Sequence, residues 1–361
     1  MNKLFVLKSN QLKTFLTDVK AFLTNCWLKY QGKLPEQIKD RIIGELLRGV
    51  EQTKLPLYKA LLENQYNYKE QTKNSYPTKM DMLPITKNVL DNMVGFELIG
   101  VQPMTGPVIL LYQLKYTERE TNEDGSKNLS LEIVANPVMA NSSKLRYCLS
   151  MEATQDMKAQ HGIDMSQELY QSVGSEISCE LGNEIINDLV SVSHKDTLML
   201  PESEHKLDYL VIGINEQVNE IARKSHRGPA NFMVMSPIMV MLLQTIKQGA
   251  GSYIMPAEKP TKLKGTDLVY MGKTSSGMMK VYSSTHPELS DNKILFGYKG
   301  SEMDSGMFMC PYLPVVPTEV VLDPVTFTPQ IKFLSRYGKF ITENVSDYYT
   351  TLTIENMPIS F

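Results

Sequence analysis

The chain has 361 residues, of which 42% are hydrophobic and 21% are charged, and its formal net charge at pH 7 is -3. A chain of this length buries a large core in two or more domains, and this composition excludes intrinsic disorder. The slightly acidic balance gives no global sign of nucleic-acid binding. No stretch approaches the roughly 18 to 20 apolar residues that span a bilayer, so we expect a soluble protein made in the cytosol.

The four cysteines favour a reducing compartment. They lie far apart and form no CxxC pair, so no disulfide framework is expected. They are predicted to act as small buried apolar groups, and the 22 methionines as flexible fillers of irregular gaps in the core. The cysteines are Cys26, Cys148, Cys179 and Cys310.

The N-terminal segment predicts an amphipathic helix over residues 12–30, because apolar side chains recur there at three- and four-residue spacing. Residues 1–33 contain six lysines against one aspartate. A basic amphipathic helix can lie on a membrane or bind an acidic partner, but docking on its own protein or on a neighbour is the favoured interpretation. The apolar positions are Leu12, Phe15, Leu16, Val19, Phe22, Leu23, Cys26, Trp27 and Tyr30.

A second helix is predicted to begin at Pro35, a residue that suits the first turn of a helix. Residues 64–81 are rich in polar side chains and are interpreted as a linker. We therefore expect residues 1–80 to form an arm outside the main core.

Residues 100–107 have the sequence GVQPMTGP and predict a stiff bend. Pro103 and Pro107 fix φ near about −65° and lack an N–H donor, whereas Gly100 and Gly106 allow backbone angles that are closed to other residues. Such a segment sets the direction of the chain that follows.

The bend leads into a predicted hairpin. Residues 108–117 and 128–134 are strand-like, and the charged tip between them contains Asp124-Gly125, a dipeptide favoured in tight turns. A long hairpin with a polar tip and few core residues beyond its base is expected to project from the body. The predicted role of this hairpin is contact with another subunit.

Two helices are expected in the centre of the chain. The first covers residues 145–160 and ends at His161-Gly162, where glycine suits the C-terminal cap. The second is capped by Asp164 and extends over residues 165–190. Its apolar positions repeat every four residues and are Leu169, Val173, Ile177, Leu181, Ile185 and Leu189.

The second central helix also carries a seam of small residues, Gly174, Ser178 and Gly182. Glycine within a helix costs up to about 1 kcal/mol relative to alanine, so a neighbour is expected to pack closely against this seam. A sheet that crosses beneath the helix is the predicted neighbour.

The rest of the chain mixes helices and strands without regular βαβ alternation, which indicates an α+β fold. Helices are expected at 207–225 and 237–246. Strands are expected at 231–235, 268–271, 278–282, 293–298, 307–311, 330–334 and 348–354.

Motifs for catalysis or cofactor binding are weak. Gly272-Lys273-Thr274 suggests a phosphate-binding loop, but Gly265 is not at the required spacing and the next segment is strand-like. GxSxG, HExxH and GxGxxG are absent. We therefore expect no catalytic residue, no cofactor and no metal. A solvated loop is the favoured interpretation of the one group with metal-ligating side chains, His194, Glu202, Glu204 and His205.

Several short fragments follow one another in a fixed order across residues 83–340. They are Gly100–Pro107, Ala159–Asp164, Arg227-Gly228 with Asn231-Phe232 and Ser236, Gly297–Gly300 with Glu302–Asp304 and Gly306, Pro311-Tyr312 with Pro314, Phe327 with Pro329, and Arg336–Gly338. Through their number and order, the chain resembles the major capsid (head) proteins of T-even-type tailed phages.

This resemblance implies the Hong Kong 97-type capsid fold. Residues 1–99 would be an N-terminal helical arm and linker, and residues 100–136 the bend and the extended-loop hairpin. Residues 137–195 and 307–361 would form a peripheral domain with a long spine helix. Residues 196–306 would form the axial domain.

The resemblance also implies a structural protein and not an enzyme. Its subunits would self-assemble through heterologous interfaces into hexamers and pentamers that form an icosahedral or elongated phage head around double-stranded DNA. The implied partners are further copies of the chain, portal, scaffolding and decoration or vertex proteins, and non-specifically held DNA, with no membrane. The implied locations are the virion and, during assembly, the host cytoplasm.

The residues expected to position the assembly contacts come from the bend, the hairpin tip, the small-residue seam and the matched fragments. They are Gly100, Pro103, Pro107, Asp124, Gly125, Gly174, Gly182, Arg227, Gly228, Gly297, Lys299 and Asp304.

The chain departs from the family pattern at its extended loop and at its N-terminus. T-even-type head proteins carry a large insertion at the extended loop, whereas only a short stretch joins Leu111 to Leu129 here. Residues 1–80 have no match. The family also removes an N-terminal segment by cleavage after glutamate, and Ile43-Gly-Glu45 and Leu61-Leu-Glu63 fit that short pattern. An uncut chain is nevertheless the expectation.

Three alternative functions stay open at the level of sequence. Two are close to the first interpretation, namely a five-fold vertex protein of the same capsid and an encapsulin-like shell. The third is of a different class, a soluble oligomeric enzyme whose site is built from residues that no motif marks.

Overall fold

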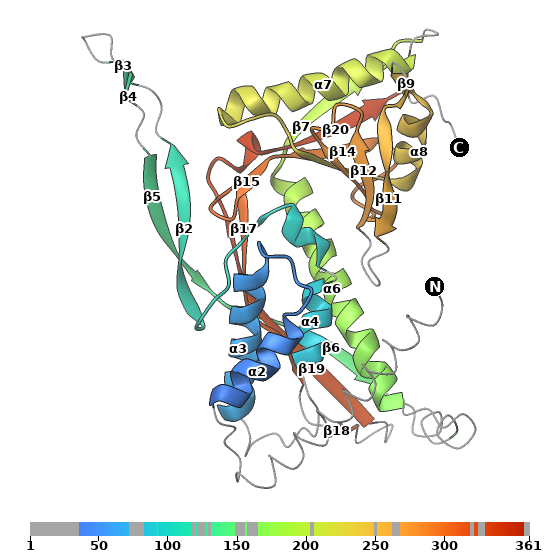
Figure 1. Cartoon of the computed structure of the whole chain (residues 1–361). Helices are drawn as coiled ribbons and strands as arrows, with labels where there is room; N and C mark the ends of the chain where they lie inside the picture. The colour runs from blue at the N-terminus through green and yellow to red at the C-terminus, as the bar shows by residue number, and fades with distance from the viewer. Residues whose placement is uncertain are drawn as a thin grey trace, which may run out of the picture.

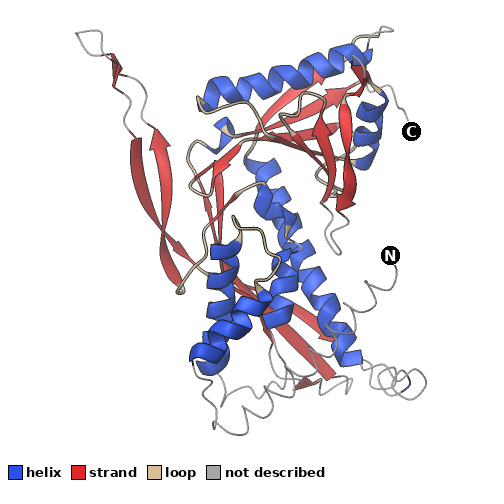
Figure 2. Ribbon diagram, viewed as in Figure 1, coloured by secondary structure: helices blue, strands red, loops and turns tan. Residues whose placement is uncertain are grey.

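The computed structural model describes residues 36–71, 83–91, 93–116, 120–121, 127–128, 131–148, 156, 165–202, 206–248, 251–261, 268–317, 321–323 and 329–356. These residues form two large sheets, a long helix beside the first sheet, a layer of shorter helices and a hairpin that projects from the body (Figures 1 and 2). The α+β class expected from the sequence is confirmed. The N-terminal helix expected over residues 12–30 lies outside the described residues.

The helices before the bend are part of the main core, so the expectation of an arm outside it is wrong for residues 36–71. Tyr58 and Leu61 lie one turn apart on one helix and are both buried in the largest hydrophobic cluster. The expected linker is also partly wrong, because the same helix continues to residue 71. The elements are α2 (Glu36–Leu46), α3 (Leu55–Gln71), α4 (Leu83–Asp91) and the 3-10 helix η1 (Val94–Glu97).

The first large sheet has five strands. Its longest strands, β17 and β19, form a long antiparallel pair, and β6 extends the sheet on the other side of β19. Residues 145–148 belong to β6, so the helix expected over 145–160 is wrong in this part. The strands are β1 (Gly100–Val101), β6 (Asn141–Cys148), β17 (Met307–Pro317), β18 (Val321–Leu322) and β19 (Pro329–Ile341).

The long helix α6 (Met165–Val192) confirms the expected second central helix. One face lies on the five-stranded sheet, where Lys339 of β19 pairs with Glu184 and Asp188 of α6 at 2.7 and 2.5 Å. Another face packs against α4 and η1. The residues 161–164 that would form its cap lie outside the described part of the chain.

The second large sheet has seven strands in the order β11-β12-β13-β8-β14-β20-β7. Helices α7 and α8 cover one face, which buries Met233 and Met235 of β8, while Phe232 and Val234 of the same strand face the core shared with α6. The bounds are β7 (His194–Met199), α7 (Lys206–Ser225), β8 (Phe232–Met235), α8 (Pro237–Thr245), β11 (Ile254–Thr261), β12 (Val269–Thr274), β13 (Lys280–Ser283), β14 (Lys293–Gly297) and β20 (Tyr349–Glu355).

The last strand does not follow the expected division of the chain. Residues 307–361 were assigned to one domain with the long helix, but β20 pairs with β14 and β7 in the seven-stranded sheet. The chain leaves the five-stranded sheet after β19, and the short helix η2 (Val345–Asp347) leads into β20. His194 lies in β7 and not in a loop, because β7 pairs with β20 along its whole length.

The projecting hairpin consists of β2 (Val108–Tyr116) and β5 (Leu131–Met139), continued by the short pair β3 (Glu120–Thr121) and β4 (Lys127–Asn128). It is the hairpin that the sequence predicts, with a longer second strand. Two further short pairs are β9 (Lys247–Gln248) with β10 (Gly251–Ser252), and β15 (Lys299–Ser301) with β16 (Asp304–Ser305).

Cys148, Cys179 and Cys310 are free thiols, and Cys26 lies outside the described residues. Burial raises the pKa of the Cys310 thiol to about 12.

None of the helices in the described ranges is long and apolar enough to cross a membrane. Within those ranges no group of three or more His, Cys, Asp or Glu side chains could hold a metal ion. Gly272-Lys273-Thr274 lies in β12, and β13 follows it, so the local structure is a strand pair.

Candidate assembly interface

The outer face of the projecting hairpin is entirely apolar. Residues directly opposite in an antiparallel pair share a face, and so do residues two apart along a strand. Leu110, Ile133 and Met139 on this face are 54%, 64% and 69% exposed. The other members of this face, from the pairing register, are Val108, Tyr112 and Leu114 of β2 and Ala135 and Pro137 of β5.

The opposite face of the hairpin anchors it to the body. Leu111 and Val138 are buried there against Phe308 and Cys310 of β17 and against Met104 of the bend. Beyond this base the described hairpin extends away from both sheets (Figure 1). The hairpin therefore has one face fixed to its own subunit and one apolar face free for contact.

The bend fixes the hairpin by hydrogen bonds as well. The side-chain amide of Gln102 donates to the Tyr112 carbonyl at 2.7 Å and to the Glu302 carbonyl at 3.0 Å, and its oxygen accepts from the Tyr112 N–H at 3.2 Å. Gln102 thus pairs with β2 much as a neighbouring strand would. The Leu114 N–H donates to the Met303 carbonyl at 3.1 Å, so the turn at residues 301–304 braces the same strand edge.

The bend residues chosen from the sequence have distinct environments. A Cβ at Gly100 would lie 2.6 Å from the Phe308 ring, so this position requires the absence of a side chain. Pro103 is half-buried, while Pro107 is exposed and its carbonyl accepts from the Ala140 N–H at 2.9 Å, at the foot of the hairpin. The tip residues Asp124 and Gly125 lie outside the described residues.

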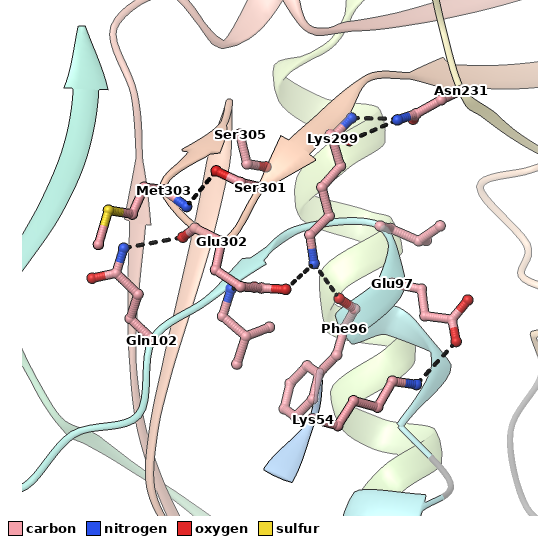
Figure 3. Close-up of polar contacts among 12 residues, drawn as sticks. Lys54, Phe96, Glu97, Gln102, Asn231, Lys299, Ser301, Glu302, Met303 and Ser305 are labelled. Atoms are coloured by element: carbon pink, nitrogen blue, oxygen red, sulfur yellow. Dashed lines mark hydrogen bonds and ion pairs between the residues drawn. The ribbon is translucent and has the colours of Figure 1, made fainter. Parts of the chain in front are cut away.

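Lys299 lies at the junction between the bend and the seven-stranded sheet (Figure 3). Its ammonium donates to the Phe96 carbonyl and pairs with Glu302, both at 2.9 Å. Its backbone exchanges hydrogen bonds with the Asn231 side chain at 3.1 and 2.6 Å. Burial lowers the pKa of Lys299, and the charges of Glu302 and Glu97 oppose that effect. The lysine therefore joins η1, β15 and the segment before β8.

A buried ion pair lies close to Lys299. Arg227 donates to Asp304, and their side chains are only 10% and 11% exposed. The Tyr348 hydroxyl lies 3.4 Å from the same carboxylate oxygen, and the Arg227 guanidinium stacks over the Tyr348 ring. A Cβ at Gly300 would lie 2.5 Å from Asp304 Oδ2, so the glycine leaves room for the carboxylate. Sequence order alone does not show that Arg227 and Asp304 meet.

Glu97 of η1 interacts with three donors that come from two separate parts of the chain. Lys54, just before α3, pairs with it at 3.1 Å, and Lys280 of β13 pairs with it at 3.4 Å. The buried Tyr282 of β13 donates its hydroxyl at 2.6 Å. Burial alone would raise the pKa of Glu97, but the Tyr282 hydrogen bond and the two lysine charges outweigh burial and lower it. Sequence reasoning missed Glu97 because neither its neighbours nor its spacing forms a motif.

Two glycines of the matched fragments, Gly228 and Gly297, lie against aromatic rings within or next to the second sheet. A Cβ at Gly297 would clash with Phe232 and Tyr349, and a Cβ at Gly228 would lie 3.2 Å from Tyr298. Both glycines therefore permit close packing beside the Arg227 pair.

The small-residue seam of α6 packs on a helix and not on the expected sheet. A Cβ at Gly174 would lie 3.6 Å from Val89 and 3.7 Å from Ile85 of α4, which is ordinary contact. Ser178 donates to the Val89 carbonyl at 3.0 Å. A Cβ at Gly182 would have no neighbouring atom within 4 Å, so the prediction that a neighbour packs closely against Gly182 is wrong. The sheet lies on another face of α6.

A projecting hairpin beside a five-stranded sheet, a long helix on that sheet and a second sheet domain together define the Hong Kong 97-type capsid fold. A comparison of the sequence with known protein families identifies the family as well. The family described as "Major capsid protein Gp23" matches residues 118–357, and the chain belongs to this family.

Curated relatives of the chain include major capsid proteins of phages. The major capsid protein of Vibrio phage KVP40 is 28% identical over 248 residues, which are 61% of this chain and 48% of the relative. That of Enterobacteria phage T6 is 27% identical over 224 residues, 56% of this chain and 44% of the relative. The chain thus spans about half the length of these relatives. Among solved structures, a chain of Mycobacterium phage Bobi has a TM-score of 0.46 and 10% identity, covering 75% of this chain and 91% of that one.

Proposed function

We propose that this chain is the repeating subunit of a tailed-phage head. Copies of it assemble into hexamers and pentamers, and these close into an icosahedral or elongated shell around double-stranded DNA. The shell forms in the host cytoplasm with portal, scaffolding and decoration or vertex proteins, and it remains in the virion. Membership of the major capsid protein family supports this role.

The observation that carries the proposal is the apolar outer face of the hairpin. Large contiguous apolar patches are rare on monomeric proteins and mark interaction sites. The face projects from one side of the subunit, and nothing among the described residues of the same subunit covers it. Contact with a different surface of the next subunit is a heterologous interface, which generates rings or open arrays.

The energetics favour assembly from many modest contacts. Fully burying a large apolar side chain contributes about 1.5 to 3 kcal/mol relative to leaving it exposed. The large side chains on this face are already partly buried, so each one contributes less when a neighbour covers it. A single hairpin contact is therefore weak, and a subunit that is wrongly placed can dissociate before the shell closes.

Electron microscopy of the purified chain tests the proposal. We expect closed particles, tubes or sheets of six-fold and five-fold capsomers at raised protein concentration. A small, stable oligomer that shows catalytic turnover would overturn the proposal in favour of the enzyme alternative. Assemblies that contain pentamers alone would instead favour the five-fold vertex alternative.

A matched pair of variants tests the hairpin face itself. Ile133→Glu places a charge on the face, and Ile212→Glu places the same charge on α7, where Ile212 is exposed to a similar degree, 61% against 64%. We expect Ile133→Glu to give folded subunits that fail to close, with Ile212→Glu assembling like the unaltered chain. Equal assembly of both variants would contradict a role for the hairpin face.

A further inference from the structure

The hairpin contacts the rest of its own subunit at two heights. At its base, Leu111 and Val138 pack on β17 of the five-stranded sheet. Farther out, the Leu114 N–H donates to the Met303 carbonyl at 3.1 Å. Leu114 lies about 20 Å along β2 from its first residue, Val108, at the rise of an antiparallel strand. The outer contact restricts the angle of the hairpin more than the base does, because it acts at a greater distance from the point of attachment.

The outer contact comes from the β15–β16 turn, residues 299–305, which connects β14 of one large sheet to β17 of the other. The side chains of this turn are held by the domain of the seven-stranded sheet. Asp304 pairs with Arg227, which follows α7, and the Ser305 hydroxyl lies 2.8 Å from the Tyr349 hydroxyl of β20. The hairpin is therefore based on one sheet and braced by the domain of the other.

Glu302, within this turn, holds the bend that leads into the hairpin. One of its carboxylate oxygens accepts from the Val101 N–H at 2.6 Å, and the other pairs with Lys299 at 2.9 Å. The Glu302 carbonyl accepts from the Gln102 side chain at 3.0 Å, and that side chain also bonds to Tyr112 of β2 (Figure 3). A hydrogen bond to a charged acceptor is roughly twice as strong as one between neutral groups. Glu302 thus fixes the residues through which the chain enters the hairpin.

We propose that the turn at residues 299–305 is a clamp through which the domain of the seven-stranded sheet sets the direction of the hairpin, with Glu302 as the positioning residue. The clamp acts within a single subunit. Its consequence for assembly rests on the proposed function: in a ring of subunits, a rotation of the seven-stranded sheet changes the place where the hairpin meets the next copy.

Distances between two spin labels on dispersed full-length subunits test the clamp. One label replaces Glu132 of β5 and the other Asn187 of α6, which are both exposed, in a chain whose native cysteines are changed to alanine. We expect a narrow distribution of distances with Glu302 present. In Glu302→Ala we expect a distribution about twice as broad, because the hairpin then swings on its apolar base. An unchanged width in Glu302→Ala would overturn the proposal.

Two matched glutamate variants separate positioning from general stability. Glu302→Gln keeps an oxygen that accepts from the Val101 N–H, so we expect it to retain most of the narrow distribution. Glu288→Ala removes an exposed carboxylate from the loop before β14 of the same domain, and we expect no change in width. Equal broadening in Glu288→Ala and Glu302→Ala would show that the whole domain is loosened, and it would overturn the role of Glu302.

A second route to the clamp covers the case in which Glu302→Ala does not fold. Gln102→Leu removes the side chain that joins the Glu302 carbonyl to β2 and leaves the pair of Glu302 with Lys299 in place. We again expect a broadened distribution, and amide exchange in β2 that is roughly tenfold faster while exchange in β14 and β17 is unchanged. A narrow distribution with unchanged exchange in β2 would overturn the clamp.

The result is independent of shell formation, because the labels report on dispersed subunits. A broadened distribution in Glu302→Ala supports the clamp even if microscopy finds no shell. If the chain forms shells and Glu302→Ala keeps a narrow distribution, the clamp fails and the shell function stands.

Discussion

Two carboxylates in this subunit have the same kinds of partner, a tyrosine and a lysine, but lie in very different parts of the fold. Glu97 and Glu184 each accept a tyrosine hydroxyl and a lysine ammonium, and both side chains are 33% exposed. Glu184 joins α6 only to β19, the strand on which the helix lies. Glu97 joins three parts of the chain: the start of α3, η1 and β13 of the seven-stranded sheet. We call the first region the spine layer and the second, with Lys299 and Arg227, the junction.

The comparison shows where the fold uses polar contacts to set geometry. In the spine layer, apolar residues of α6 such as Ile177 and Leu181 are buried in the main cluster, so the helix would stay in place without its ion pairs. At the junction the chain passes between two sheets. The hydrogen bonds and ion pairs there join side chains that are far apart in the sequence. Loss of a polar contact at the junction should therefore change the relative position of the elements that meet there. Loss of an ion pair in the spine layer should only weaken the packing of α6 on its sheet.

The largest expected effect comes from the buried ion pair of the junction. Arg227→Met leaves Asp304 buried without its partner, and breaking a buried pair on one side costs about 3 to 5 kcal/mol. Lys339→Met in the spine layer removes a cation that is 28% exposed, and we expect about 1 kcal/mol or less. Denaturant unfolding of both variants measures the difference. Similar losses of unfolding free energy in the two variants would show that the Arg227–Asp304 pair stabilises the fold no more than the ion pairs of Lys339 do.

Alanine at two glycines should have opposite effects in the two regions. Gly297→Ala places a methyl group against Phe232 and Tyr349 at the junction, and such overpacking costs about 1 to 3 kcal/mol. Gly182→Ala in the spine helix meets nothing within 4 Å and gains up to about 1 kcal/mol of helix propensity. Thermal unfolding should place the melting temperature of the first variant below, and that of the second above, the unaltered chain. A destabilised Gly182→Ala would restore the idea of a close-packed spine.

Removal of the two matched carboxylates should cost similar stability but act at different places. Glu97→Met leaves the buried Tyr282 hydroxyl without its acceptor, and Glu184→Met does the same to Tyr337, a loss of about 1 to 3 kcal/mol each. Amide hydrogen exchange distinguishes the two variants by the elements in which exchange becomes faster. We expect faster exchange in α3 and β13 for Glu97→Met, and only in α6 and β19 for Glu184→Met. The same exchange pattern in both variants would refute the distinction between junction and spine layer.

Local sequence patterns predicted the elements but not the junction. The periodicity of residues 165–190 and the strand-turn-strand pattern after the bend were sufficient for α6 and for the hairpin, because both depend on short-range spacing. Residues 145–148, the second half of β6, are expected as the start of a helix, because their strand conformation depends on pairing with β19 far along the chain. The Arg227–Asp304 pair and the three donors of Glu97 are likewise contacts between distant residues. The resemblance marked Arg227, Lys299 and Asp304, but no pattern marked Glu97.

The smallest predicted effect is a split in the pH dependence of the two regions. The folded pKa of Glu97 is lowered, so its contribution is present above the unfolded pKa of about 4.3 and is lost as pH falls through the folded pKa. Burial lowers the pKa of Lys339, but the hydrogen bonds that its ammonium donates to Asp188 and Glu184, together with the charges of these carboxylates, raise it overall. Its contribution is therefore present below about pH 10.4 and is lost as pH rises through the folded pKa.

Unfolding free energies measured from acid to alkaline pH test this split. Glu97→Met should flatten the acid limb of the profile and leave the alkaline limb unchanged, whereas Lys339→Met should do the reverse. The effect is small because both side chains are partly exposed and water screens their charges. An acid limb that Glu97→Met leaves intact would mean that other carboxylates dominate acid sensitivity. The junction would then be held by Tyr282 and the backbone contacts of Lys299, with the charge of Glu97 contributing little.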